Sequence, residues 1–193
     1  MPGPVLPGTI RQIGYLVTDF DRALEEWVAL GVGPWFVLRE ITQTGIYRGE
    51  PCTVTLSIGF ANSGDLQIEV IHQDDDTPSV YSEFTAAGGD GYHQLAYWAQ
   101  NYDEALAAGQ AAGWPVVWSG GDPDSARFTY FEAPAGTATI IADQDSEALY
   151  VRVGGTLYPV LNLTSARLIA GQPDNPTRAR RSDIDEWPKG QLS

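Results

Sequence analysis

The sequence predicts an α+β fold made of two copies of one βαβββ module. Two stretches match when Gln12 is laid on Gln94, an offset of about 82 residues. Each stretch reads as a short apolar strand followed by an amphipathic helix, and β-rich sequence follows each helix. With 193 residues, of which 43% are hydrophobic, the chain can bury one sizeable core or two small ones side by side.

The repeat aligns QIGYLVTDFDRALEEWVALG with QLAYWAQNYDEALAAGQAAG. In each copy the strand ends at an Asp or Asn turn, and Ala and Leu then recur at the three- and four-residue spacing of a helix. Gly31 and Gly113 stand where each helix ends. The first copy continues with VGPWFVLREI, CTVTLSIGFA and DLQIEVIHQ, and the second with WPVVWSG, ARFTYFEA and TATIIADQD.

These segments place the modules at about residues 10–75 and 92–144. Two such modules join their sheets edge to edge or curl them around one cleft, and that cleft is where we expect a ligand. The sequence leaves open whether the modules pair within one chain or between two chains, so a homodimer is a possible partnership.

The composition of the chain indicates which classes of partner and which cellular location to expect. The formal charge of −14 and the pI near 4.3 repel phosphate backbones and anionic headgroups, so we expect neither a nucleic acid nor a membrane as partner. Cys52 is the lone cysteine, which excludes an intrachain disulfide and thiolate-rich metal sites. The N-terminal sequence has no signal-peptide pattern, and we expect a cytoplasmic protein.

Charge also divides the chain. Residues 1–145 hold 5 basic and 20 acidic residues, whereas residues 146–193 hold 6 and 5. The polar stretch DQDSEAL lies at this change. We therefore predict a domain over residues 1–145 and an extension over residues 146–193.

Residues 10–143 resemble the vicinal oxygen chelate superfamily of glyoxalases, methylmalonyl-CoA epimerases, extradiol dioxygenases and bleomycin-resistance proteins. The resemblance rests on the paired QIGYLVTDFDRAL and HQLAYWAQNYDEAL, on GVGPWFV, on LQIEVIH and on RFTYFEAPAGTATII. It implies a glyoxalase-like fold, closest to the epimerase and glyoxalase branch.

The resemblance also implies a metal site at Gln12, Glu69, Gln94 and Ile140, where the family holds a divalent ion. The family usually has His at the two Gln positions and Glu at the Ile position, so only Glu69 keeps the usual ligand type. Amide oxygens are weaker ligands and Ile has no lone pair. We expect a degenerate site with no cofactor; the alternative is one weakly bound divalent metal.

The two histidines do not restore this site if both strands are regular. His93 is adjacent to Gln94 and should face away from it, and His72 should lie on the face opposite Glu69. A bulge at Tyr92–Gln94 would bring His93 in.

What remains is a polar floor of Glu69, Gln12 and Gln94 with aromatic walls. Glu69 is the candidate catalytic residue, because a desolvated carboxyl has a pKa nearer neutrality and suits a general acid or base. An equally weighted alternative is that Glu69 has a structural role only, as a carboxylate that hydrogen-bonds the two Gln amides. The candidate ligand-binding residues are Gln12, Gln94, Trp35, Tyr97 and Tyr130.

These residues predict a small-molecule binding protein whose ligand is a partly apolar carbonyl compound. If the chain is an enzyme, the resemblance implies a metal-independent isomerase or epimerase with Glu69 as the base. Two alternatives stay open: a non-catalytic binding protein of the bleomycin-resistance type, often dimeric, and a divalent-metal lyase or epimerase with unusual ligands.

The extension carries a second resemblance. LYVRVGGTLYPVLNLTSARLIAG and the exit ending in WPKGQL resemble part of EccB, a membrane-anchored component of type VII secretion systems. From the residues alone, LYVRVGGTLYPV predicts a hairpin with its turn at VGG. A fourth hypothesis, a secretion-associated adaptor, rests on this tail alone.

Overall fold

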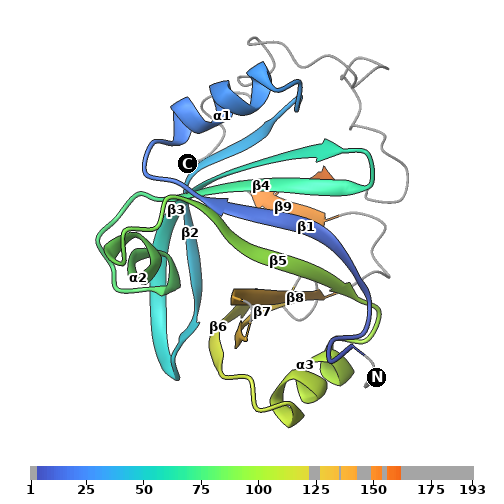
Figure 1. The fold of residues 1–193 in the computed structure, drawn as a ribbon. Helices are drawn as coiled ribbons and strands as arrows, with labels where there is room; N and C mark the ends of the chain where they lie inside the picture. Colours follow the sequence, from blue (N-terminus) through green and yellow to red (C-terminus); the bar gives the residue numbers. More distant parts are fainter. Residues whose placement is uncertain (1–3, 122–126, 135, 143–148, 154–155, 162–193) are drawn as a thin grey trace.

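The two modules close into one eight-stranded barrel. The structure, a computed structural model, describes residues 4–121, 127–134, 136–142, 149–153 and 156–161. Around the barrel the strands follow the order β1-β4-β3-β2-β6-β7-β8-β5 (Figure 1). The predicted pair of βαβββ modules is confirmed, and both modules come from one chain.

The first module runs from β1 to β4. β1 pairs with β4 in parallel, and β4, β3 and β2 are antiparallel neighbours. Their bounds are β1 Thr9–Leu16, α1 Phe20–Ala29, β2 Phe36–Tyr47, β3 Glu50–Ser63 and β4 Leu66–Gln73. A short helix, α2 (Val80–Ala86), connects this module to the next.

The second module repeats the same order. β5 pairs with β8 in parallel, and β8, β7 and β6 are antiparallel neighbours. Their bounds are β5 Gly91–Ala99, α3 Tyr102–Ala111, β6 Val116–Gly121, β7 Arg127–Ala133 and β8 Gly136–Ala142. Two antiparallel seams join the modules, β1 with β5 and β2 with β6.

Local sequence sets the two long helices. The Asp19 side chain accepts a hydrogen bond from the Arg22 backbone N–H at the start of α1, and Asn101 caps α3 through Glu104 in the same way. Gly31 and Gly113 follow the helices with positive φ, which glycine adopts without strain. Each predicted turn and helix end is therefore present.

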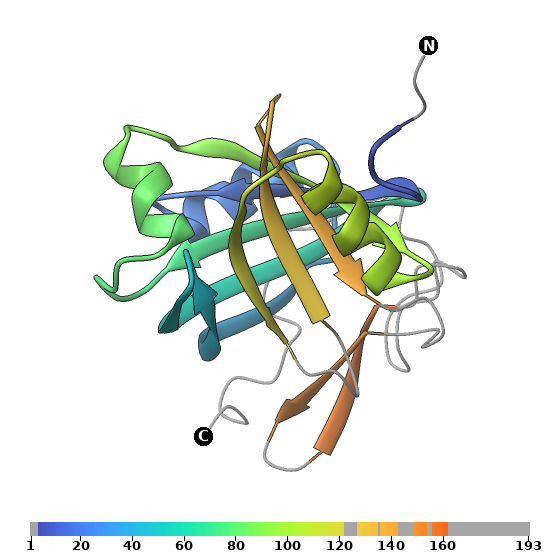
Figure 2. The same ribbon diagram turned by 90° about the horizontal axis from the view of Figure 1, so that it is seen from below.

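Three groups of apolar side chains fill the structure. One lies inside the barrel and against α2; Leu56, Trp118 and Tyr130 belong to it. The second packs between α1 and the outer face of the first module, and the third between α3 and the second module. α1 and α3 lie on opposite sides of the barrel (Figures 1 and 2). The apolar side chains inside the barrel thus form a group of their own, separate from the two outer layers.

A separate two-stranded antiparallel sheet follows, made of β9 (Leu149–Val153) and β10 (Thr156–Leu161). The predicted hairpin is therefore present, whereas its turn at residues 154–155 and the rest of the extension, residues 162–193, lie outside the described residues. Among the residues that the structure describes, no helix has the length and apolarity needed to span a membrane.

The packing of α3 gives a test of the fold. A Cβ at Gly109 would lie 2.7 Å from Cζ of Phe131, so α3 approaches the sheet where a larger residue does not fit. We expect Gly109→Ala to lower the free energy of unfolding by about 1–2 kcal/mol, although Ala is the better helix former. Urea unfolding measures this change.

The control is Ala107→Gly on the exposed side of the same helix, which should cost about 1 kcal/mol through helix propensity alone. A Gly109→Ala protein more stable than the wild type would show that α3 does not pack against Phe131 as described.

Candidate functional site

Polar side chains enter the barrel from three neighbouring strands. On β4, Gln67, Glu69 and Ile71 share the inner face. Gln12 on β1 and Gln94 on β5 also point inward, and each is at most 2% exposed. Because apolar side chains fill most of the interior, these groups must find partners among themselves.

Gln94 reaches Glu69 across the barrel. Its Nε2 donates a hydrogen bond of 3.1 Å to Oε2 of Glu69. Gly14 lies opposite Gln94 on β1, and a Cβ there would come within 2.5 Å of the Gln94 side chain. Gly14 therefore provides the space in which Gln94 turns toward Glu69. Sequence reasoning missed this residue, although Gly14 aligns with the small Ala96 in the repeat.

A β-bulge changes the position of His93. Gly14 pairs with Gln94 and the next residue, Tyr15, pairs with Tyr92, so His93 is the extra residue of β5. His93 is buried, its Nδ1 lies 3.2 Å from Oε1 of Gln94, and its ring packs near Tyr130. The expectation that His93 faces away from Gln94 is wrong, because the bulge breaks the alternation of faces.

His72 behaves as expected. It lies on the face opposite Glu69, and its Nδ1 is 2.9 Å from the carbonyl oxygen of Val17. It takes no part in the interior cluster.

The Glu69 carboxyl is the electrostatic centre of the interior. Burial raises its pKa to about 8, although the hydrogen bond from Gln94 acts in the opposite direction. At pH 7 the carboxyl is therefore mostly protonated. Burial also lowers the pKa of His93 to about 4, so its imidazole is neutral at the same pH.

Two phenols complete this cluster. Burial raises the pKa of Tyr130, as does the nearby charge of Glu69, while a hydrogen bond from Gln94 lowers it. The Tyr81 hydroxyl lies 3.4 Å from the Tyr130 hydroxyl. Tyr81 comes from α2, and sequence reasoning missed it because nothing in the sequence places that helix against the interior. The cluster is thus one carboxyl surrounded by neutral hydrogen-bonding groups.

Gln12 belongs to a second polar layer. It pairs with Ala96 rather than Gln94 on β5, and its Nε2 donates to Oε1 of Gln67 at 2.5 Å. Oε1 of Gln12 and Nε2 of Gln67 are buried and have no hydrogen-bond partner in the protein. Leaving such groups unpaired costs about 1–3 kcal/mol each, so this layer is suited to pairing with a bound polar group.

The remaining predicted ligand-binding residues do not lie together. Tyr130 lies in the interior cluster, as described. Trp35 is fully buried in the layer under α1, beside Trp27, and Tyr97 packs in the layer under α3. Tyr97 is three positions from Gln94 on the same strand, and an odd spacing puts two side chains on opposite faces. Of the three aromatics, only Tyr130 is brought to Glu69.

Ile140 lies on β8, where its backbone pairs with Tyr97 and Thr129. Its side chain lies outside the described part of the structure.

The arrangement does not fit the divalent ion that the resemblance implies. Gln94 presents its amide nitrogen, not its oxygen, to Glu69, and Gln12 is committed to Gln67 in the next layer. Glu69 is the one carboxylate among the four positions. Among the described residues, no three His, Cys, Asp or Glu side chains are grouped so as to hold a metal. A dication prefers charged oxygen or imidazole donors that converge on one point.

Solved structures share this fold. A hypothetical protein from Bacillus halodurans superposes with a TM-score of 0.53 and 16% identity, covering 72% of this chain and 96% of its own. Methylmalonyl-CoA epimerase from Streptomyces coelicolor, in complex with 2-nitronate-propionyl-CoA, superposes with a TM-score of 0.50 and 17% identity, covering 71% and 98%. At these identities the likeness concerns the fold alone.

The end of the chain is similar to a different family. Residues 130–193 match the model of the type VII secretion system ESX-1 transport TM domain B. The ESX-3 secretion system ATPase EccB3 of Mycolicibacterium smegmatis is 61% identical over 57 residues, and the ESX-5 secretion system ATPase EccB5 of Mycobacterium tuberculosis is 58% identical over 65. The matches cover 30% and 32% of this chain, but only 11% and 13% of those proteins.

The larger part of the chain matches one family model. The model of the Glyoxalase/Bleomycin resistance protein/Dioxygenase superfamily matches residues 11–131, which include α1, α2 and α3 and the interior glutamines Gln12, Gln67 and Gln94. Together with the paired modules and the epimerase-like fold, this match confirms the resemblance seen in the sequence. The chain belongs to the Glyoxalase/Bleomycin resistance protein/Dioxygenase superfamily.

Proposed function

We propose that the chain binds a small, partly apolar carbonyl compound inside the barrel and moves a proton on the carbon next to the carbonyl. The reaction would be an isomerisation or epimerisation with Glu69 as the base. One observation carries this proposal: the buried Glu69 carboxyl, held by Gln94, has a pKa of about 8. A group that gains and loses a proton near neutral pH is suited to general acid–base work.

The proton and the electron pair of this step can both be followed among the named residues and the ligand. The ionised Glu69 takes the proton as the C–H bond breaks, and the electron pair moves onto the carbonyl oxygen. The amide of Gln94 and the hydroxyl of Tyr130 are the neighbouring donors that would hold this oxygen. The protonated carboxyl then returns the proton to carbon. Neutral donors stabilise an enolate less than a dication does, so turnover should be modest.

The second polar layer supports binding. The unpaired oxygen of Gln12 and the unpaired amide nitrogen of Gln67 offer one acceptor and one donor to a polar substituent of the ligand. The apolar lining beside them suits the rest of the molecule. The epimerase fold of the Streptomyces coelicolor structure agrees with this class of chemistry.

Proton exchange on a substrate tests whether Glu69 acts as the base. In D₂O, the wild-type protein should exchange the acidic proton of methylmalonyl-CoA or of a small 2-substituted 3-oxothioester, followed by ¹H NMR. Because only ionised Glu69 can act as base, the exchange rate should rise with pH through about 8 and level off above it. Glu69→Gln should lower the rate at least about 100-fold.

Asp65→Asn, at an exposed acidic position, is the charge-matched control and should keep the wild-type rate. Equal exchange by Glu69→Gln and wild type would contradict a role for Glu69. Binding of these compounds without exchange would instead support the non-catalytic alternative.

The raised pKa of Glu69 also makes the stability of the protein depend on pH. Because the folded pKa of Glu69, about 8, exceeds the ordinary carboxyl value of 4.5, the folded protein keeps a proton that the unfolded chain releases between these pH values. Unfolding free energy should therefore fall as pH rises through this window, by about 4 kcal/mol for this group. Glu69→Gln carries no titrating group and should lose this component.

Urea unfolding of both proteins at pH 5 and pH 9 measures the effect. The Gln variant should gain stability relative to wild type between the two values. A constant difference across the range would show that Glu69 titrates as an ordinary exposed carboxyl.

A substitution at Gly14 tests the hydrogen bond between Gln94 and Glu69. A Cβ at this position would displace the Gln94 side chain and weaken its hydrogen bond to Glu69. That bond favours the ionised carboxylate, so Gly14→Ala should raise the pKa of Glu69 and shift the pH midpoint of exchange upward. The matched control is Ala96→Gly, opposite Gln12, which should leave the midpoint unchanged. If the pH midpoint of exchange moved equally in both variants, the shift would not come from the hydrogen bond of Gln94, and the prediction would be wrong.

A further inference from the structure

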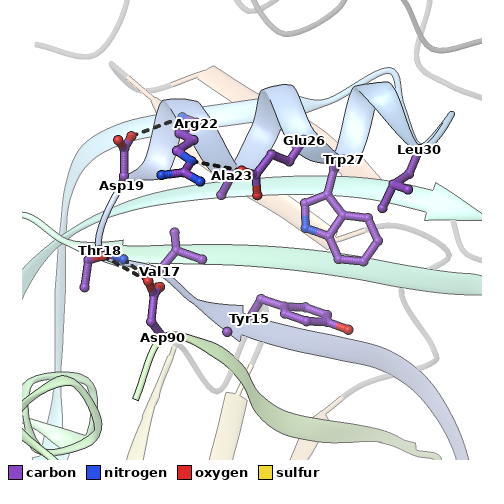
Figure 3. Close-up of a pocket in the computed structure, with 11 residues that line it drawn as sticks. Tyr15, Val17, Thr18, Asp19, Arg22, Ala23, Glu26, Trp27, Leu30 and Asp90 are labelled. Atoms are coloured by element: carbon purple, nitrogen blue, oxygen red, sulfur yellow. Dashed lines mark hydrogen bonds and ion pairs between the residues drawn. The ribbon is translucent and has the colours of Figure 1, made fainter. Parts of the chain in front are cut away.

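A groove runs along the outside of the barrel between α1 and the ends of β1 and β5. It encloses about 410 Å³ and is distinct from the interior cluster, because none of its lining residues belongs to that cluster. Figure 3 shows it from the side, with Asp19 at one end of α1 and Leu30 at the other. The lining includes Tyr15, Thr18, Arg22, Glu26, Trp27 and Asp90.

One end of the groove is aromatic. Trp27 points from α1 toward Tyr15, and the two rings meet edge to face with centroids 5.0 Å apart (Figure 3). Outside the groove lining, Tyr92, which is 46% exposed, contacts Tyr15 edge to face with ring centroids 6.4 Å apart. Leu30, at the end of the helix, is 76% exposed. These side chains present apolar surface to solvent.

The other end is acidic and partly preorganised. Both oxygens of Asp90 accept hydrogen bonds from Thr18, one from its backbone N–H and one from its hydroxyl, each at 3.1 Å. These bonds span 72 residues of sequence and fix the carboxylate at the groove wall. Each oxygen retains a lone pair for a further donor. Asp19 and Glu26 add two more carboxylates to the lining.

The basic residue of the groove is already paired. Nε of Arg22 donates to Glu26 at 2.9 Å, so these two charges offset each other. Asp19 and Asp90 remain as the net charge of the lining, in a protein whose overall charge is −14. An anion would meet repulsion here, whereas a cation would be attracted.

We propose that this groove binds an organic ammonium compound with an aromatic or alkyl body. The ammonium group would lie against Asp90, where charge-assisted hydrogen bonds form. The body would lie against Trp27 and Tyr15, which offer apolar contact and, to a charge placed above a ring face, cation–π attraction.

The test compares three probes of similar size on the full chain: 2-phenylethylammonium, 3-phenylpropionate and 2-phenylethanol. Saturation-transfer NMR and calorimetry should detect saturable binding of the ammonium, at least about fivefold tighter than the alcohol, and no binding of the carboxylate. Raising salt from about 20 mM to about 300 mM should weaken ammonium binding severalfold.

Asp90→Asn should weaken ammonium binding at least about threefold and leave alcohol binding unchanged, while Trp27→Leu should weaken both. Asp65→Asn, an exposed carboxylate outside the groove, is the control for net charge. Far-ultraviolet circular dichroism confirms that each variant is folded. Equal affinity for the carboxylate, or equal effects of Asp90→Asn and Asp65→Asn, would overturn the proposal.

The test is independent of the interior cluster, and Glu69→Gln should bind the ammonium probe as the wild type does. Absence of saturable binding at millimolar probe would also overturn the proposal, without bearing on proton transfer by Glu69.

Discussion

The burial of one carboxyl organises the interior of this protein. Glu69 is buried among neutral polar groups and apolar side chains, where a lone charge would cost several kcal/mol. The fold accommodates it by protonation and by one hydrogen bond from Gln94. That bond in turn requires that nothing larger than hydrogen stand at Gly14. The hydrogen bond that Glu69 on β4 accepts from Gln94 therefore constrains the residue at position 14 on β1.

The repeat makes this arrangement understandable. Each module begins with a strand that carries an inward Gln and, two residues later, a small residue on the same face: Gln12 with Gly14, and Gln94 with Ala96. Because β1 and β5 are antiparallel, each Gln lies opposite the small residue of the other strand. Both strands also carry a bulge just before the Gln, at Arg11 and His93. The two glutamines differ in their hydrogen-bond partners, which are Gln67 for Gln12 and Glu69 for Gln94.

The sequence predicted the elements of the fold well and the faces of individual residues less well. Strands and helices follow from periodicity and turn residues, which are local, so the modules were predictable. The position of His93 was not, because a bulge results from the pairing of two strands and leaves no local mark. Tyr97 could have been placed outside the barrel, since its odd spacing from Gln94 decides its face. Trp35 and Tyr81 depend on how α1 and α2 pack, which one sequence does not reveal.

The strand that closes the second module links the two family matches. The superfamily match ends at residue 131 and the secretion-system match begins at residue 130, before the boundary predicted at residue 145. β8 thus lies in the sequence that resembles EccB, yet its backbone pairs with both β5 and β7. Strand pairing uses backbone groups that every residue except proline supplies, so an alternating apolar segment suffices to complete a barrel.

A metal ligand, in contrast, requires one side-chain type at one position. The resemblance implies Glu at the position of Ile140, and Ile140 belongs to β8. The register pairs Ile140 with Tyr97 and Thr129, whose side chains contact the layer under α3 and not Glu69. β8 thus closes the barrel through its backbone. Among the interior residues that the structure describes, Glu69 is the acidic group, and its pKa of about 8 together with the hydrogen bond from Gln94 leaves this cluster mostly neutral at pH 7.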